Sequence, residues 1–276
     1  MNKLSISEIF DVTKRNIAIT GAAGLLGSQY ASTLCAGGAN LILIDYNESQ
    51  NTKLQKELSK KYHTKVKAYT VDITNEKEVI ELRKKIIHDY GRIDGLINNA
   101  AFTNKFALDT STKTHNTNFE EYPSSIWEKS LAVNLTGMFY CCREFGREMM
   151  KQKAGVIVNI ASTYGIVGAD QRIYGKSGIN SPISYAAAKG AVINLTRYLA
   201  AYWQGKNIRV NTLSPGGVVD ETYQSKEFIK NYSYRTMLGR MAKKDEYNGA
   251  ILFLMSDASS YMTGANLVVD GGWTAW

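Results

Sequence analysis

The stretch that decides the fold is "TGAAGLLG", Thr20–Gly27, which continues the apolar run "NIAIT" at 16–20 and opens a helix-like segment. Its glycines, Gly21, Gly24 and Gly27, lie three residues apart, unlike those of the G-x-G-x-x-G fingerprint or the P-loop. A strand, a glycine turn and a helix in this order let the backbone approach an anion, while the helix N-terminus supplies N–H donors and a positive dipole. The stretch therefore predicts a turn that holds the pyrophosphate of a dinucleotide.

Short runs rich in β-branched residues alternate with helix-length segments along the chain. The predicted strands are 16–20, 40–45, 66–72, 95–100, 155–162, 208–215 and 267–272, and the helix-like runs include 51–62, 76–91 and 124–152. Alternation at this spacing predicts a parallel sheet with helices on both faces. No repeat, linker or change of composition divides the chain, so we expect residues 1–276 to form one α/β domain.

The formal net charge of +8 admits a nucleic acid, a membrane surface or an anionic small molecule as a partner. The lysines are dispersed, however, and in 51–62 the apolar residues fall four apart on one helix face and leave the lysines outside. This pattern is typical of a solvated basic surface, so we expect neither a nucleic acid nor a membrane as partner. The longest apolar run, "AILFLM", is too short to span a bilayer.

The three cysteines, Cys35, Cys141 and Cys142, form neither a C-x-x-C pair nor an even framework, which is typical of a reducing compartment. The N-terminal "MNKLSISEIF" lacks the apolar core of a secretion signal. The three histidines are scattered and make no metal-ligand constellation. We therefore expect a cytoplasmic protein without a structural or catalytic metal.

An acidic residue follows the glycine turn at a distance that favours NAD. The predicted strand 40–45 ends in Asp45, eighteen residues after Gly27. A carboxylate at this position accepts hydrogen bonds from both adenosine ribose hydroxyls and repels a 2′-phosphate. Neither Arg nor Lys lies between Gly21 and Gly27, and Tyr46 follows where an NADP site can offer Arg. We therefore expect NAD rather than NADP.

The segment "SYAAAKGAVINL" carries the candidate chemistry. Lys189 follows Tyr185 by four residues, which sets both side chains on one helix face. A tyrosine is a poor base at its ordinary pKa of about 10, but a nearby ammonium and a positive nicotinamide can lower that pKa. Tyr202 and Lys206 repeat the spacing just before a strand, where Lys206 is interpreted as a charge at a helix end.

A serine distinguishes Tyr185 from the second tyrosine. Ser162 lies at the carboxyl end of the predicted strand 155–162, and ligands of open parallel sheets bind beyond such ends. Its hydroxyl can hydrogen-bond a reacting oxygen from the side opposite the tyrosine. The alternative is that Ser162 only caps a turn.

Two polar segments, 103–124 and 165–183, interrupt the alternation and are predicted to cover the substrate, with tolerated surface insertions as the alternative. The second brings Arg172, Tyr174 and Lys176 between Ser162 and Tyr185. Arg and Lys clamp phosphate or carboxylate and Tyr binds hydroxyls, so we expect a polar, anionic, sugar-like substrate. The alternative is that both cations face solvent.

Taken together, these residues resemble the short-chain dehydrogenase/reductase family. The motifs follow the family's order over nearly the whole chain: "TGAAGLLG", "VDI" at 71–73, "NNAA" at 98–101, "VNLTG" at 133–137, "NIAS" at 159–162, "YAAAK" at 185–189, "IRVNTLSPGG" at 208–217 and "VVDGG" at 268–272. The resemblance implies a Rossmann-like, doubly wound sheet of seven parallel strands. It also implies a catalytic set consisting of Asn134, Ser162, Tyr185 and Lys189.

The resemblance assigns a role to each of these residues. Tyr185 is the acid/base, Lys189 lowers its pKa and binds the nicotinamide ribose, Ser162 orients the carbonyl, and Asn134 holds a water of the proton relay. Asp72 and Ile73 border adenine, Asn99 and Ala100 the adenosine, and Val218 the nicotinamide amide. The full set expected to bind NAD is Gly21, Gly24, Leu25, Leu26, Gly27, Asp45, Asp72, Ile73, Asn99, Ala100, Tyr185, Lys189, Pro215 and Val218.

The chain departs from the single-domain pattern at Leu25 and Ala101, where such members carry glycine. Its glycine spacing is similar to that of the extended branch, which includes sugar epimerases and dehydratases with a large C-terminal domain, whereas only some sixty residues follow "SPGG" here. An NAD-retaining epimerase or dehydratase is therefore an alternative to an NAD-dependent alcohol or ketone oxidoreductase. A non-catalytic dinucleotide sensor is a third, although members of that kind typically lose Tyr or Lys.

Two further expectations come from the resemblance. The polar segments and the "GGWTAW" tail are similar to dehydrogenases of flagellin-modification and surface-glycan pathways, which implies a carbohydrate substrate. The family commonly forms homotetramers through the helices at 125–150 and 185–203. The apolar residues of the first helix exceed one core-facing stripe, which favours packing on two sides, with a buried helix in a monomer as the alternative: Phe139, Tyr140, Phe145, Met149 and Met150.

Overall fold

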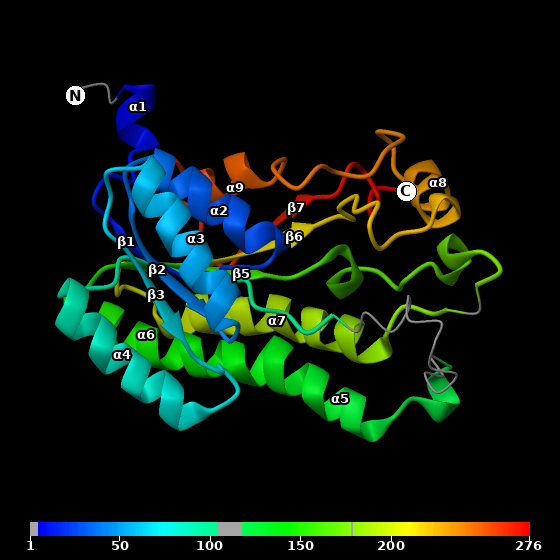
Figure 1. Cartoon of the computed structure of the whole chain (residues 1–276), viewed down its shortest axis with the longest axis horizontal. Helices are drawn as coiled ribbons and strands as arrows, with labels where there is room; N and C mark the ends of the chain where they lie inside the picture. Colours follow the sequence, from blue (N-terminus) through cyan, green and yellow to red (C-terminus); the bar gives the residue numbers. More distant parts are fainter. Residues whose placement is uncertain (1–4, 104–117, 178) are drawn as a thin grey trace.

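The computed structural model describes residues 5–103, 118–177 and 179–276. Its centre is one sheet of seven strands in the order β3-β2-β1-β4-β5-β6-β7, and every pairing is parallel (Figure 1). The strands are β1 (Asn16–Thr20), β2 (Asn40–Asp45), β3 (Val66–Thr70), β4 (Gly95–Asn98), β5 (Gly155–Ile160), β6 (Ile208–Pro215) and β7 (Asn266–Val269). The predicted doubly wound α/β fold is confirmed.

Four predicted strands extend too far, and the difference has one cause. The structure ends β3, β4 and β5 two residues before the predicted carboxyl ends, and β7 three residues before. The excess residues leave the sheet and turn toward the place where ligands bind in parallel sheets. A polar residue at the end of an apolar run therefore belongs to the site as much as to the strand.

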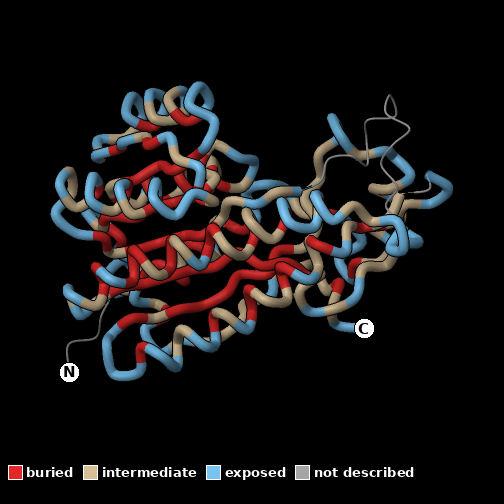
Figure 2. Tube along the Cα trace, turned by 90° about the horizontal axis from the view of Figure 1, so that it is seen from below, coloured by how far each residue is buried: buried red, intermediate tan, exposed pale blue. Residues whose placement is uncertain are grey.

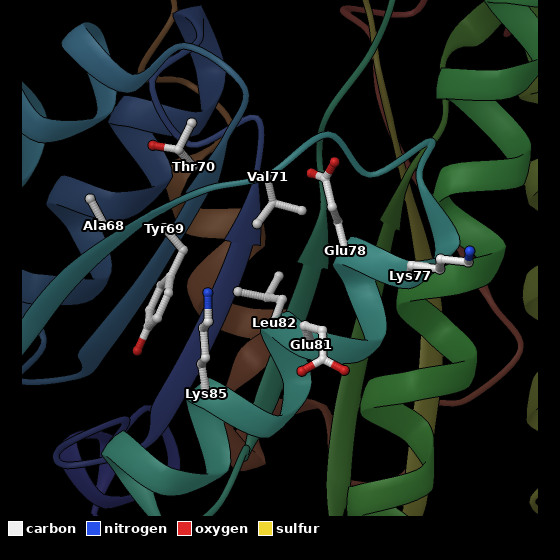
Figure 3. Close-up of a pocket in the computed structure, with 9 residues that line it drawn as sticks. All are labelled: Ala68, Tyr69, Thr70, Val71, Lys77, Glu78, Glu81, Leu82 and Lys85. Atoms are coloured by element: carbon white, nitrogen blue, oxygen red, sulfur yellow. The ribbon is translucent and has the colours of Figure 1, made fainter.

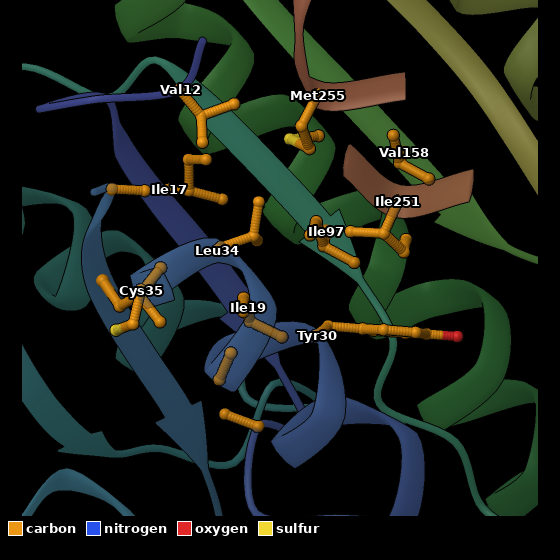
Figure 4. Close-up of a cluster of buried hydrophobic side chains, with 14 of the residues drawn as sticks. Val12, Ile17, Ile19, Tyr30, Leu34, Cys35, Ile97, Val158, Ile251 and Met255 are labelled. Atoms are coloured by element: carbon orange, nitrogen blue, oxygen red, sulfur yellow. The ribbon is translucent and has the colours of Figure 1, made fainter. Parts of the chain in front are cut away.

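Helices cover both faces of the sheet. One face carries α2 (Leu25–Ala36), α3 (Glu48–Lys61) and α9 (Asn248–Met255), and the other carries α4 (Glu76–Tyr90), α6 (Met138–Gln152) and α7 (Ile183–Tyr202). Along β1 the side chains alternate between the two cores, with Ile17 and Ile19 in one and Ala18 in the other. Figure 2 shows the buried sheet between these layers, and Figure 4 shows part of the first core, built around Ile17, Ile19 and Leu34.

The helical run predicted at 124–152 is not one regular α-helix. It consists of α5 (Ser124–Leu131), a π-helical turn η3 (Ala132–Gly137) and α6. Periodicity alone did not predict the π turn, because one turn of i→i+5 bonding leaves the pattern on either side intact. Such turns are frequent at functional sites, and this one contains Asn134.

The residues named for assembly divide into two groups. Phe145 and Met149 are fully buried in the core, whereas Phe139 is 42% exposed. On α7, Tyr198 and Tyr202 are also exposed and stack on each other at 6.2 Å. Among the described residues, no helix has the length and apolar character needed to cross a membrane.

Smaller elements complete the chain. They are α1 (Ile6–Ile9), α8 (Lys226–Tyr234) and the 3-10 turns η2 (Phe119–Glu121), η4 (Thr163–Gly165), η5 (Gln171–Tyr174) and η6 (Asp257–Ser259). In Figure 1, α8 and the C-terminus lie beyond the end of the sheet toward which β6 and β7 run. The candidate site is therefore at this end of the molecule.

Candidate active site

The glycine turn between β1 and α2 is closely packed. Gly21 has φ +62°, and a Cβ added to it would lie 2.7 Å from the Cα atom of Ala100. A Cβ on Gly27 would lie 2.2 Å from the carbonyl oxygen of Gly21. Side chains at these two positions would therefore push the turn away from α2 and from the residues after β4.

This turn fits a dinucleotide. Gly24 is the N-cap of α2 in an extended conformation, no side chain caps the helix, and its first turn contains no acidic residue. The first N–H groups of a helix have no partner within it, so those of Leu25, Leu26 and Gly27 can serve an anion. A pyrophosphate is the part of NAD that needs such a cradle.

Asp45 is fixed beside the same turn. Its carboxylate accepts one hydrogen bond from the Ala23 N–H at 3.0 Å and another from the Asn47 N–H at 3.0 Å. The side chain is 7% exposed, whereas the neighbouring Tyr46 is 80% exposed. The structure thus brings the acid of β2 to the glycine turn, as the sequence predicted, with no cation following it.

The residues expected at the adenosine are held by local bonds. Asp72 accepts hydrogen bonds from the N–H and hydroxyl of Thr74 at 2.9 and 2.8 Å. Ile73 packs in the core, where a Cβ on Gly137 would lie 2.8 Å from its side chain. What Ile73 can offer a ligand is therefore its main chain.

Asn99 and Ala100 follow β4 and bind back to the end of β1. Asn99 Nδ2 donates to the carbonyl oxygens of Thr20 and Gly21 at 3.2 and 2.9 Å. Thr20 Oγ1 accepts from the N–H groups of Asn99 and Ala100, each at 3.1 Å. The sequence analysis missed Thr20, although its place directly before Gly21 was the available signal.

Tyr185 and Lys189 lie on one face of α7, as their spacing predicted. Lys189 Nζ lies 5.5 Å from the centroid of the Tyr185 ring and donates a hydrogen bond to the Ile160 carbonyl at 2.6 Å. Lys189 is 1% exposed, and this burial lowers the pKa of its ammonium to about 8. The amine thus titrates near neutral pH.

Ser162, directly after β5, is close to the same tyrosine. Burial raises the pKa of the Tyr185 phenol, and a hydrogen bond with the Ser162 side chain opposes that rise. Ser162 Oγ also accepts from the Tyr164 N–H at 3.2 Å, so its own proton is left for another acceptor. Without a cofactor, the described residues therefore leave the pKa of Tyr185 above its ordinary value, although Lys189 is near.

Asn134 is fully buried in the π turn η3. Its amide nitrogen donates to Phe102 O at 3.0 Å and Ser130 Oγ at 3.1 Å, and its amide oxygen accepts from Phe102 N at 2.7 Å. Both amide protons are therefore used within the protein. A water bound at this position therefore has to donate hydrogen bonds to main-chain carbonyl oxygens. A π turn changes which N–H group each of these carbonyls binds.

The structure places the substrate candidates as follows. Arg172 binds Asp170 through two nitrogens at 2.8 and 2.9 Å and is 81% exposed, and Arg235 binds the same carboxylate at 3.1 Å. Tyr174 packs against Phe228 at 5.3 Å. Lys176 is exposed. Most of the segment 103–124 falls on residues 104–117, which lie outside the described residues.

An aromatic cluster, of which the sequence pointed to Tyr174 alone, includes part of the segment 165–183. We call it the aromatic lobe, and its rings are Tyr164, Tyr174, Phe228, Tyr232 and Trp273. Tyr232 stacks on Trp273 at 4.2 Å, and Tyr164 meets Trp273 edge-on at 6.4 Å. No local motif marks it, because its members come from four distant segments.

Pro215 ends β6, and Val218 forms a parallel bridge with Ala242 and accepts a hydrogen bond from Gln224 at 2.8 Å.

A separate surface pocket of about 500 Å³ lies between β3 and α4 and includes Tyr69, Lys77 and Lys85 (Figure 3). It contains none of the catalytic candidates. In the described part of the chain, no group of three or more His, Cys, Asp or Glu side chains is arranged to hold a metal.

Comparison with known proteins shows which families and enzymes this chain is similar to. A family model described as enoyl-(acyl carrier protein) reductase matches residues 21–274. The chain is 35% identical over 267 residues to galactitol 2-dehydrogenase (L-tagatose-forming) of Cereibacter sphaeroides, covering 94% of each. It is 30% identical over 275 residues to D-threitol dehydrogenase of Mycolicibacterium smegmatis, covering 99% of this chain and 97% of that protein.

Solved structures of dehydrogenases are also similar to this chain. A short-chain dehydrogenase from Leptospira borgpetersenii with bound NAD+ is 33% identical with a TM-score of 0.83, covering 99% of this chain and 97% of the other. A gluconate 5-dehydrogenase from Burkholderia cenocepacia in complex with NADP and tartrate is 27% identical with a TM-score of 0.85, covering 99% and 100%. Both cofactors occur among these similar structures, so the preference of this chain depends on its own residues.

Proposed function

Because this chain belongs to the short-chain dehydrogenase/reductase family, we propose that it is an NAD(H)-dependent enzyme that interconverts a secondary alcohol and a ketone on a polar, sugar-like substrate. The observation that carries the proposal is the meeting of Ser162, Tyr185 and Lys189 beyond β5. Ser162 and Lys189 are buried and hydrogen-bonded, Tyr185 is half-buried beside them, and the glycine turn that fits a pyrophosphate follows β1 in the same sheet.

In this mechanism Tyr185 transfers the proton. A bound nicotinamide supplies the acceptor or donor of the hydride. In the direction of oxidation, Tyr185 Oη takes the proton of the substrate hydroxyl, and in reduction it returns that proton to the carbonyl oxygen. Ser162, whose Oγ already accepts from Tyr164 N–H, donates its own proton to the reacting oxygen and holds that oxygen near Tyr185.

Lys189 supports the phenolate of Tyr185. One of its three protons is bound by the Ile160 carbonyl, which leaves two for a ribose hydroxyl or a water. Since burial raises the pKa of Tyr185, phenolate formation needs positive charge nearby, and the ammonium supplies it below its own pKa of about 8. We therefore assign Lys189 both an electrostatic and a binding role.

Two features support the choice of cofactor and substrate. The buried carboxylate of Asp45, with no cation among its neighbours Ala23, Asn47 and Tyr46, favours NAD over NADP. The names of the two relatives, galactitol 2-dehydrogenase and D-threitol dehydrogenase, favour a polyol or sugar. We propose that Tyr174, Arg172 and Lys176 lie on the substrate side of the site.

The test is a 340 nm assay of NAD+ against galactitol, threitol, xylitol and sugar phosphates, with NADH against the matching ketoses. We expect turnover with at least one polyol, and loss of about 10³-fold or more in Tyr185→Phe with NADH binding retained. Tyr202→Phe is the matched control, because Tyr202 has the same spacing to a lysine but is 67% exposed. Substantial activity in Tyr185→Phe would contradict the assignment.

The same preparation distinguishes the alternatives. An epimerase or dehydratase that returns its hydride within one turnover keeps its NAD, so cofactor that stays with the protein through gel filtration, together with no net NADH formation, would favour that class. A sensor would bind NADH and leave every member of the panel unchanged. Either result would replace the dehydrogenase.

We also propose a homotetramer. The exposed rings of Phe139, Tyr198 and Tyr202 lie on α6 and α7, the helices through which the family commonly assembles. Light scattering at micromolar concentration is expected to give four times the chain mass of 30.6 kDa. A mass near that of one chain would exclude the tetramer.

A further inference from the structure

The peptide unit that joins Gly216 and Gly217 has an unusual pair of partners. It lies between the end of β6 and Val218. Its N–H, on Gly217, donates to the hydroxyl of Tyr232 at 2.6 Å. Its carbonyl, on Gly216, accepts from the hydroxyl of Tyr247 at 3.0 Å. Both polar groups of one peptide are thus bound by tyrosine hydroxyls.

The two tyrosines come from different parts of the fold. Tyr232 lies on α8 in the aromatic lobe, is 4% exposed and stacks on Trp273. Tyr247 is the N-cap residue of α9, is fully buried and packs in the core of the sheet. The peptide therefore connects the lobe on the substrate side to the core that supports the cofactor.

Packing leaves this peptide little room to tilt. A Cβ on Gly217 would lie 2.5 Å from the ring of Tyr232, and a Cβ on Gly216 would lie 2.8 Å from the Cα atom of Asp270. Main-chain bonds hold its flanks, from Gly216 N to the Val269 carbonyl at 2.9 Å and from Ala242 N to the Gly217 carbonyl at 3.0 Å.

The hydroxyl of Tyr232 reaches a second element. The side chain of Thr163, the residue after Ser162, also acts on this hydroxyl and by itself lowers its pKa. Burial raises the pKa of Tyr232 to about 12 and that of Tyr247 above its ordinary range, so both phenols stay neutral and Tyr247 keeps the proton that it donates to the Gly216 carbonyl. One phenol therefore bridges the segment after β5 to the segment after β6.

We propose that Tyr232 and Tyr247 are positioning residues that clamp the Gly216–Gly217 peptide and so orient Val218 toward the nicotinamide end of the cofactor. The inference rests on the proposed function in assigning a nicotinamide dinucleotide to this site, and on the expectation that Val218 binds its nicotinamide end. Through Thr163, the clamp also fixes the position of residues 216–218 relative to Ser162. A shift of α8 is then transmitted to the cofactor.

The test compares two ligands on three conservative variants. Tyr232→Phe and Tyr247→Phe each keep the ring and remove one hydroxyl, which leaves one polar group of the peptide without its partner. We expect each to weaken NADH by about ten-fold while leaving ADP-ribose, which lacks the nicotinamide, within about two-fold, since a lost bond to a buried group is felt locally. Calorimetry and NADH fluorescence measure both affinities.

Tyr30→Phe is the matched control. Tyr30 is fully buried in the same core as Tyr247 (Figure 4), and among the described residues its hydroxyl has no hydrogen-bond partner. We expect this variant to bind NADH and ADP-ribose as the wild type does. Circular dichroism of each variant verifies the fold, and if one of the clamp variants does not fold, the other carries the test.

The outcomes separate the clamp from a purely structural role. Equal weakening of NADH and ADP-ribose, or no weakening of NADH in either clamp variant, would overturn the proposal. Wild-type protein that binds NADH but oxidises no polyol would refute the proposed activity and leave the clamp open to the same measurement. A protein that binds neither ligand would refute both.

Discussion

The two halves of the candidate site are built in different ways. On the cofactor half, which we define as residues 16–103, the turn after β1 is held by main-chain groups and by side chains from Asp45, Thr20 and Asn99. Each of these lies at the end of a short strand. The aromatic lobe consists of rings from four separate segments, and its shape depends on how those rings pack.

The difference is expected from what we propose that each half binds. A pyrophosphate and a ribose are constant, so fixed backbone donors and one carboxylate suffice, and short motifs specify them. A substrate differs from enzyme to enzyme, and side-chain packing can change without disturbing the sheet. We therefore expect the cofactor half to tolerate little change and the aromatic lobe, apart from Tyr232, to tolerate more.

The largest expected effect tests this contrast directly. Gly27→Ala places a Cβ 2.2 Å from a backbone oxygen of the turn, and we expect it to cost about 3 kcal/mol of unfolding free energy or more and to abolish NADH binding. Gly168→Ala, in the segment after Ser162, meets nothing within 4 Å and is expected to stay within about 0.5 kcal/mol of wild type. Thermal unfolding and NADH fluorescence measure both variants.

The contrast would fail if both alanine variants behaved alike. A well-folded Gly27→Ala protein that binds NADH normally would mean that the turn can rearrange. A strongly destabilised Gly168→Ala protein would mean that the substrate side is as constrained as the turn.

The same division explains what the sequence could predict. All seven strands, Asp45 and the Tyr185–Lys189 pair came from patterns within one segment, since periodicity and i,i+4 spacing are local properties. The π turn around Asn134 and the pairing of Arg172 with Asp170 are local, but they leave the apolar periodicity unchanged. The clamp of Tyr232 and Tyr247 depends on contacts between distant segments. No spacing rule contains that information.

The next effect concerns the stability of the folded protein, which the buried ammonium of Lys189 lowers. Lys189 is buried, and its pKa falls from 10.5 to about 8 in the folded protein. Lys189→Met removes this burial cost along with one hydrogen bond, so we expect the variant to be inactive but about 2 kcal/mol more stable than wild type at pH 7.

The sign of the pH dependence follows from the lowered pKa. Between pH 8 and 10.5 the unfolded chain binds more protons at Lys189 than the folded chain does, so this group makes wild type more stable as pH rises through that window. Below pH 8 the full cost of the buried ammonium is present. The advantage of Lys189→Met is therefore expected to shrink from pH 8 to 10.5, and urea unfolding that showed a constant or growing advantage would contradict the burial argument.

A smaller effect tests the charge on the cofactor half. Asp45→Asn removes the negative charge and keeps an acceptor oxygen for only one of the Ala23 and Asn47 N–H groups, because these two groups bind different carboxylate oxygens. We expect the preference for NADH over NADPH to fall by about ten-fold, because a 2′-phosphate is no longer repelled. Calorimetry with both cofactors measures it, and equal or tighter binding of NADPH by the wild type would refute the choice of NAD.

The smallest effect is expected on the substrate side. The guanidinium of Arg172 is 81% exposed and already bound to Asp170, so removing it takes away a solvent-screened interaction. We expect Arg172→Ala and Lys176→Ala each to raise the KM for the polyol or sugar by roughly two- to five-fold, with kcat and NADH affinity unchanged. Asp170→Asn should have the larger effect of the three, because Asp170 also holds Arg235, whose guanidinium carbon lies 5.8 Å from the Trp273 ring centroid. If KM for the best polyol stays at the wild-type value in all three variants, these charges do not face the substrate, and recognition on this side belongs to the aromatic lobe alone.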